Sequence, residues 1–167
     1  LLVILFVGEY VLNPAKTAQE QSETSQVKSK SGTKQSEKSK ESMQIQKATI
    51  MASGDMLYHD IVYGSAFDGE KYDFSNDYEQ ITSLISSADL ALGDFEGTIN
   101  PDYELAGYPI FNAPESVITS IKNAGYDALD LAHNHILDTG LSGLKYTANA
   151  FQKAGLDTFG VNVPGDK

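Results

Sequence analysis

Three short polar clusters in the sequence bring together the residue types that bind metal ions. The clusters are 54–59 (Gly-Asp-Met-Leu-Tyr-His), 93–97 (Gly-Asp-Phe-Glu-Gly) and 133–138 (His-Asn-His-Ile-Leu-Asp), and between them they hold all three histidines of the chain. Imidazole nitrogens, carboxylate oxygens and amide oxygens are the ligands that hard and borderline divalent metals take from proteins. The pattern therefore predicts metal-assisted chemistry on a phosphoester or a related bond.

A two-metal site needs one carboxylate that bridges the ions and separate ligands for each ion, with the metals about 3.5–4 Å apart. Asp94 is the expected bridge, because it directly follows the second predicted strand. Asp55 and His59 would hold one ion, and Asn134 would hold the other. Glu96 is a reserve ligand, although it could instead cap a loop. These five residues are the predicted metal ligands.

The last cluster supplies the predicted catalytic residue. His135 could act as a general acid on the leaving group, because imidazole titrates near neutral pH. We expect His133 to be a solvated neighbour and Asp138 to cap the following helix. A Gly-Asp pair after a strand is also common in turns, so the specific signal is the joint occurrence after three successive strands.

The elements that must position these clusters alternate between strand and helix. Short apolar runs predict strands over 48–53, 88–92, 128–132 and 158–161. Apolar stripes at helical spacing predict helices from an N-cap at Ser75 to residue 88, over 114–124 before Gly125, and over 141–151 before Gly155. Strands joined by helices indicate an α/β fold with a mainly parallel sheet, whose ligands gather beyond the carboxyl ends of the strands.

Composition narrows the class of partner. The chain has 167 residues, no Cys and a net charge of -11, and all 12 of its basic residues are Lys. Without Cys there is neither a disulfide nor a thiolate metal site, and without Arg no guanidinium can clamp a phosphate. From residue 48 onward, 18 acidic residues face five Lys. Such a surface repels nucleic acid and attracts cations, so we expect no nucleic-acid partner.

The first 47 residues differ from the rest in composition. Residues 1–12 are apolar but shorter than the ~20 residues of a membrane span. We interpret them as the end of a truncated signal-anchor or transmembrane helix, with a cleaved signal peptide as the alternative. Residues 13–47 are rich in Gln, Ser, Lys, Glu and Thr, and we expect a disordered linker. The predicted arrangement is a single-pass membrane anchor that tethers a folded domain.

Six segments of this chain resemble, in order and spacing, the bacterial capsule synthesis proteins of the CapA type, also called the poly-gamma-glutamate biosynthesis protein family. The segments are Gly54-Asp55, 93–96 (Gly-Asp-Phe-Glu), 111–114 (Phe-Asn-Ala-Pro), 124–127 (Ala-Gly-Tyr-Asp), 131–135 (Leu-Ala-His-Asn-His) and 138–140 (Asp-Thr-Gly). The resemblance covers residues 48–162. It implies a metallophosphatase-like (calcineurin-like) α/β sandwich, of which 48–167 would be the N-terminal half.

The resemblance also implies where the protein works and with what. It implies a membrane-anchored domain outside the cytoplasm, divalent metal ions such as Mn, Zn or Fe, an anionic polymer or its precursor, and capsule synthesis or export subunits in the membrane. Two features depart from the family. Its usual Asn is His133 here, and its further His motifs, which supply the remaining metal ligands, do not follow in this chain. We therefore expect weak metal binding by these residues alone.

Two functions are compatible with these features. The first is a metal-dependent hydrolase or transferase domain in capsule or poly-gamma-glutamate synthesis at the cell surface. The second is a non-catalytic assembly or polymer-export subunit that keeps the fold. The absence of Arg and the incomplete ligand set favour the second for this chain taken alone. Measuring the metal content distinguishes the two hypotheses.

Overall fold

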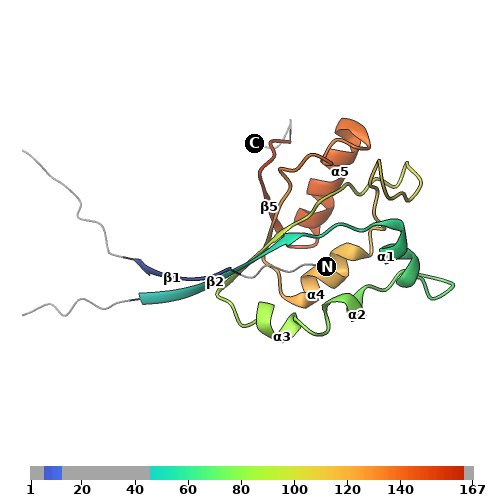
Figure 1. Ribbon diagram of the computed structural model, residues 1–167. Coiled ribbons are helices and arrows are strands. Elements are labelled where there is room, and N and C mark those ends of the chain that lie inside the picture. Colours follow the sequence, from blue (N-terminus) through green and yellow to red (C-terminus); the bar gives the residue numbers. More distant parts are fainter. Residues whose placement is uncertain (1–5, 13–45, 164–167) are drawn as a thin grey trace, which may run out of the picture.

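The computed structural model describes residues 6–12 and 46–163, which form five strands and five helices (Figure 1). In chain order the elements are β1 (Phe6–Leu12), β2 (Gln46–Asp55), α1 (Asp60–Ser65), α2 (Ser75–Tyr78), α3 (Thr82–Ile85), β3 (Leu90–Asp94), α4 (Val117–Ala124), β4 (Ala128–Asp130), α5 (Gly140–Lys153) and β5 (Asp157–Phe159). The three polar clusters lie at or just after the ends of β2, β3 and β4.

The strands form one sheet in the order β1-β2-β3-β4-β5. Strands β2 to β5 are parallel, and β1 pairs antiparallel with β2. Neighbouring parallel strands need a crossover connection, and α4 and α5 supply it between β3, β4 and β5. The predicted mainly parallel α/β sheet is confirmed, and the four predicted strands all form at the expected places.

The hydrophobic core lies between the sheet and the helices that cover one of its faces (Figure 1). Ile121 of α4, Leu129 of β4 and Phe151 of α5 have no exposed surface or almost none. The ring of Phe151 packs edge-on against Phe95, with centroids 4.9 Å apart. Each such side chain contributes roughly 1.5–3 kcal/mol on burial. The apolar stripes predicted for both helices are therefore core, apart from Leu141, which is exposed.

Helix α4 ends as the sequence predicts. Gly125 follows its last residue in the left-handed conformation, with φ 99°, and its N–H bonds to the carbonyl of Lys122. A Cβ at this position would also lie 2.8 Å from the Cβ of Ser86. Glycine therefore allows both the turn into β4 and the close approach of the segment after α3.

The helix predicted over 75–88 is wrong as a single element, because the structure divides it into α2 and α3. Ser75 is the first helical residue rather than the N-cap, and Phe74 precedes it without a side-chain cap. The Thr82 hydroxyl donates to the carbonyl of Tyr78, and the N–H of Ile81 bonds to the same residue. Two β-branched residues and a hydroxyl that competes for backbone carbonyls disfavour a continuous helix here.

The N-terminal apolar segment is a strand where the sequence suggested the end of a helix. Residues Phe6–Leu12 form β1, which pairs with 46–52 and extends away from the helices together with that part of β2 (Figure 1). The β-branched and aromatic residues of this segment, Phe6, Val7, Tyr10 and Val11, favour a strand. Within 6–12 and 46–163, none of the helices combines the length and hydropathy needed to cross a bilayer. The membrane anchor stays a prediction, and the predicted linker lies outside the described residues except at 46–47, which begin β2.

Candidate metal centre

Three carboxylates stand side by side where the parallel strands end. Asp55 of β2 is in register with Asp94 of β3, and Asp94 is in register with Asp130 of β4. A bulge between Ala52 and Asp55 shifts the register and brings this pair together. Because paired residues of neighbouring strands point to the same side of a sheet, the three side chains form one row. We call Asp55, Asp94 and Asp130 the carboxylate row.

The environment of Asp94, the middle residue of the carboxylate row, disfavours its ionised form. Burial raises the pKa of Asp94 to about 6, and the charges of Asp55 and Asp130 add to the effect. The Asp94 Oδ1 atom is buried and lacks a hydrogen-bond partner among the described residues. Buried polar atoms are rarely left without a partner, so an unpaired carboxylate oxygen between two other carboxylates is the atom that a cation would satisfy.

Glu96 extends the acidic cluster beyond the strand end. Burial raises the pKa of its carboxyl group, and Asp55 adds to the rise through its charge and a hydrogen bond. The nearby His135 partly opposes this effect. Glu96 Oε1 lies 4.0 Å from His135 Nε2, and both side chains are largely buried. Of the predicted site residues, Asp55, Asp94, Glu96 and His135 are thus brought together.

His135 makes two further contacts that hold its ring. Its Nδ1 lies 2.8 Å from Asp138 Oδ2, and its ring packs edge-on against Phe111, with centroids 4.6 Å apart. The expectation that Asp138 caps α5 is wrong, because Thr139 holds the N-cap position and no side-chain cap forms. Asp138 instead binds His135 and the N–H of Phe111.

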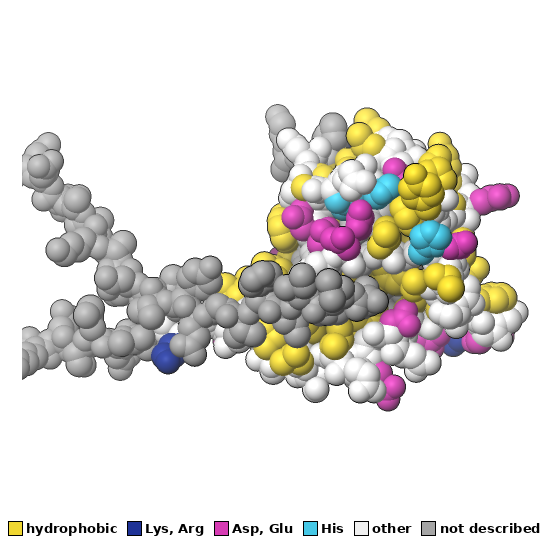
Figure 2. Space-filling model, in the orientation of Figure 1, with side chains coloured by type: hydrophobic (Ala, Val, Ile, Leu, Met, Phe, Trp, Pro, Cys, Tyr) yellow, Lys and Arg dark blue, Asp and Glu magenta, His cyan; other side chains and the backbone are white. Residues whose placement is uncertain are grey.

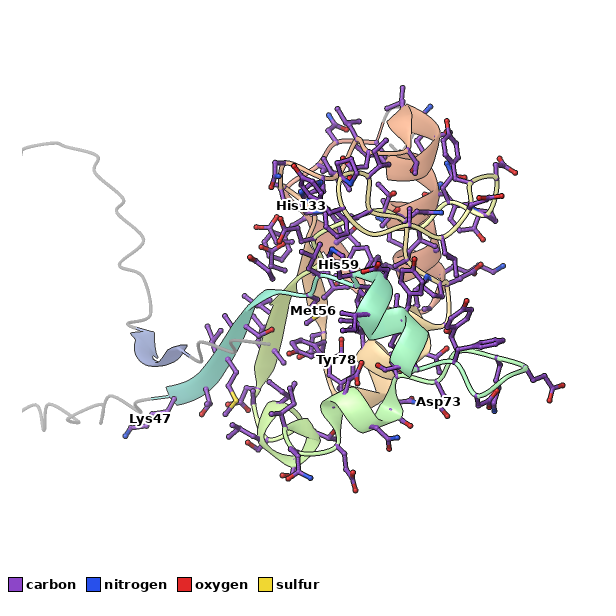
Figure 3. The ribbon with its side chains drawn as sticks, turned by 45° about the vertical axis from the view of Figure 1, so that its right-hand side comes forward. Lys47, Met56, His59, Asp73, Tyr78 and His133 are labelled. Atoms are coloured by element: carbon purple, nitrogen blue, oxygen red, sulfur yellow. The ribbon has the colours of Figure 1, made fainter. Side chains whose placement is uncertain are left out.

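The other predicted site residues lie around this group. His59 pairs with its neighbour Asp60, and its ring lies edge-on to Phe111 at a centroid distance of 5.7 Å. Asn134 is exposed, next to His135 in the loop after β4. Figure 3 shows His59 and His133 at the same end of the sheet. No hydrogen bond or ion pair within the described residues joins His59 or Asn134 to the carboxylate row.

His133 is less solvated than the sequence suggested. Its side chain is half-buried, and the backbone N–H groups of Gly97 and His135 approach its two ring nitrogens. Burial lowers the pKa of His133, and the neighbouring His135 lowers it further. A neutral imidazole that accepts a backbone N–H is a structural link between the loops after β3 and β4.

These groups form one acidic and histidine-containing face. Figure 2 shows acidic and histidine side chains gathered on the same face, with hydrophobic side chains between the two histidine positions. Two features of these residues fit a divalent cation. They supply carboxylate and imidazole ligands, and one oxygen of Asp94 has no hydrogen-bond partner among the described residues. Among the described residues, no three His, Asp or Glu side chains converge closely enough to hold a metal ion by themselves. The carboxylate row is therefore a partial ligand set.

A buried polar network holds the loop that carries Phe111. The Asn112 side chain accepts the N–H of Asn100 at 2.8 Å and donates to the carbonyls of Asn100, Tyr103 and Glu104 at 3.0–3.2 Å. Asn112 has 1% of its surface exposed, so these bonds replace water completely. The sequence segment 111–114 thus contributes a loop anchor, a role that residue types alone did not reveal.

An apolar cavity of ≈ 760 Å³ adjoins Asp55 between β2, α1 and α2. Figure 3 shows Met56 and Tyr78, two of its lining residues, facing each other beneath α1. Its lining residues are Gly54, Asp55, Met56, Leu57, Tyr58, Ile61, Val62, Ser65, Asp77 and Tyr78. The cavity offers space for an uncharged group close to the acidic cluster.

The raised pKa of Asp94 predicts how the metal-free protein responds to pH. Because the folded-state pKa is about 6 and the ordinary value is 3.8, this group's stabilising contribution is complete below pH 3.8 and is lost as the pH rises through 6. Asp94→Asn has no carboxyl group to titrate at this position, so the variant should not lose this contribution. The difference in free energy of unfolding between the variant and the wild type should therefore shift in favour of the variant by about 1 kcal/mol from acidic to neutral pH, after allowance for solvent screening. Urea unfolding at several pH values measures this difference, and a difference that does not vary with pH would contradict it.

The fold and the site together define the class of protein. An α/β unit with four parallel strands and carboxylates at their carboxyl ends is consistent with a calcineurin-like fold, and the predicted fold class is confirmed. The model of the family "Bacterial capsule synthesis protein PGA_cap" matches residues 49–165. The chain belongs to this family of capsule biosynthesis proteins.

A relative from Bacillus anthracis agrees with this assignment. The protein called "Capsule biosynthesis protein CapA" is 32% identical over 88 residues. The match covers 50% of this chain and 21% of that protein. The chain therefore spans about a fifth of the length of the relative that it matches, and what the whole relative does is carried over below only as a proposal.

Proposed function

We propose that this chain forms part of a divalent-cation-dependent hydrolase or transferase that acts on a phosphoester or a related bond in capsule synthesis. The observation that carries the proposal is the buried Asp94 Oδ1, which has no hydrogen-bond partner among the described residues. Asp55 and Asp130 flank it in register. Three adjacent carboxylates repel one another, and a bound cation would relieve that repulsion.

The residues of the site divide into two tasks. The carboxylate row would hold the cation, with Glu96 beside it, while His59 and Asn134 stay predicted ligands. His135 would transfer a proton to the leaving group through Nε2, the ring nitrogen that faces Glu96. A bound divalent ion would polarise the reacting oxygen and offset developing negative charge. Mn, Zn and Fe all accept this mixture of carboxylate and imidazole ligands.

The proposed substrate and surroundings rest on the name of a relative. The matched relative is named for capsule biosynthesis, so we propose an anionic capsule polymer or its precursor as substrate, with capsule synthesis or export subunits as partners at the cell membrane. An anionic group would need the cation at the carboxylate row. An uncharged part of the substrate suits the cavity beside Asp55, because its lining is mainly apolar and its two carboxylates, Asp55 and Asp77, would repel an anion.

The experiment that tests this proposal separates metal binding from proton transfer. In the longest natural form of the protein, we expect His135→Ala to keep its bound metal and to reduce capsule production at least tenfold, because a general acid typically contributes 10²–10⁴-fold. Metal analysis of the purified variant and capsule measurement in the organism that encodes this chain provide the two readouts. Leu137→Ala, at an exposed position of the same loop, is the matched control. If capsule production were unchanged with His135→Ala, His135 would not be a catalytic residue.

A second candidate is a non-catalytic assembly or polymer-export subunit of a membrane capsule synthesis complex. One observation favours it, since the side chains of the described residues do not converge into a complete metal site. In that case, Asp94→Asn and His135→Ala would both leave capsule production unchanged, whereas substitutions that unfold the domain would abolish it.

A further inference from the structure

The cavity beside Asp55 is bounded by a helix whose side chains do not fill it. No residue of α1 is buried, and Ile61, which lines the cavity, is largely exposed. Protein interiors are normally packed as densely as organic crystals. The cavity has a volume of ≈ 760 Å³ and a mainly apolar lining. Small-molecule sites are typically roughly 300–1,000 Å³ and apolar with a few polar groups, so this cavity has the size and character of a ligand site.

Two tyrosine hydroxyls meet in the wall of the cavity. Tyr58 and Tyr78 are both buried, and their hydroxyls hydrogen-bond to each other. Tyr78 donates its own hydrogen to Met56 Sδ at 3.8 Å, so Tyr58 is the donor within the pair. The Tyr58 oxygen accepts no hydrogen bond from the described residues. It is therefore free to accept one from a ligand.

A carboxylate without a partner lies next to this hydroxyl pair. Asp77 of α2 lines the same cavity, and no hydrogen bond or ion pair to its carboxylate forms within the described residues. Burial raises the pKa of Asp77. Burial also raises the pKa values of Tyr58 and Tyr78, and the charge of Asp77 adds to both, which places this charge close to the hydroxyls. An unpaired carboxylate in partly apolar surroundings attracts a cation.

We propose that this cavity binds a small organic amine, with its apolar body between β2 and α1 and its ammonium group at Asp77 and Tyr58. The lining residues include the carboxylates of Asp55 and Asp77 and no Lys, so the charge of the cavity attracts a cation and repels an anion. An ammonium group donates up to three hydrogen bonds, which the Asp77 carboxylate and the Tyr58 oxygen accept. The inference goes beyond the proposed function, because it requires neither a bound metal nor catalysis.

Hexylammonium, hexanol and hexanoate test the inference, because they share one alkyl chain and differ in charge. The readout is the NMR signal of the Met56 methyl group in the 167-residue chain, at about pH 7 and without divalent metal. Met51 is buried but does not line the cavity, so its methyl signal is the internal reference. We expect hexylammonium to bind about tenfold more tightly than hexanol, because hydrogen bonds between charged groups are the stronger kind. Hexanoate should leave the Met56 signal unchanged.

Three variants locate the site. Asp77→Asn should weaken hexylammonium binding about tenfold and leave hexanol binding unchanged, because it removes only the charge. Glu79→Gln is the matched control, since it removes the same charge from an exposed residue at the end of α2 that does not line the cavity. It should bind both compounds as the wild type does. Val62→Phe should weaken both, because Val62 lines the cavity and a larger side chain fills part of it.

Several results would overturn the inference. In the wild-type chain, an unchanged Met56 signal with hexylammonium, or binding no tighter than that of hexanol, would show that the cavity is not an amine site. Equal loss of binding in Asp77→Asn and Glu79→Gln would mean that the acidic surface attracts ammonium ions without a defined site. Undiminished binding by Val62→Phe would place the ligand elsewhere. Because these measurements contain no metal, failure of the proposed function would be recognised separately, by the metal and capsule measurements.

Discussion

Asp94→Asn is expected to abolish the stabilisation that Mn²⁺ or Zn²⁺ confers on this chain. A ligand at one hundred times its Kd stabilises a protein by about 2.7 kcal/mol, and the variant lacks the charged oxygen that lies buried and unpaired between Asp55 and Asp130. Thermal unfolding with increasing metal concentration measures the effect. Binding by this chain should be weak, because the carboxylate row is only a partial ligand set.

Asp157→Asn is the matched control for that experiment. It removes the same charge at the start of β5, at the opposite edge of the sheet from the row. We expect this variant to keep the metal-dependent stabilisation of the wild-type chain. Equal loss in both variants would mean that the acidic surface attracts cations without a defined site, and the proposed metal centre would then be wrong.

Asn112→Ala is expected to destabilise the fold by about 3 kcal/mol, because it leaves several buried backbone groups without partners. The side chain bonds to Asn100, Tyr103 and Glu104, which belong to the loop between β3 and α4. Loosening this loop should also release Phe111 from the two histidine rings that it contacts. Urea unfolding gives the free energy of unfolding for the variant and the wild type.

Asn149→Ala provides the comparison, since Asn149 is exposed on α5. Its substitution should change the free energy of unfolding by less than about 0.5 kcal/mol. If Asn112→Ala were as mild as this control, the loop would be held by other contacts, and the role given to the buried amide would have to be abandoned.

The sheet could be predicted because short apolar runs indicate its strands and apolar residues at helical spacing indicate the helices between them. Val117 and Ile121 of α4 recur at helical spacing, as do Ala148 and Phe151 of α5, and all four are buried. Gly125 adopts the left-handed conformation that ends α4. The break between α2 and α3 lies at Ile81 and Thr82, where β-branched side chains and a Thr hydroxyl that bonds to the backbone disfavour a continuous helix. Periodicity does not detect such a break. The strand β1 was missed because an apolar run can form a strand or a helix end, and only its pairing with β2 decides.

The site was predictable in part for a similar reason. Asp55 and Asp94 follow predicted strands, so the edge at which they meet could be derived from topology. Asp130 was missed, although it also ends a strand, because it stands outside the histidine cluster. The partner of Asp138 depends on the path of the loop that brings Phe111 to it, 27 positions away. Such contacts arise from tertiary structure and leave no local pattern.

The most direct test of the metal centre is to locate Mn²⁺ by paramagnetic broadening of amide NMR signals in the 167-residue chain. The account predicts that substoichiometric Mn²⁺ broadens the signals around Asp55, Asp94, Glu96 and 130–135 first, and that Asp94→Asn prevents this. Broadening that begins instead at the acidic segment 68–77, or that spreads evenly over the acidic surface, would contradict a cation site at the carboxylate row.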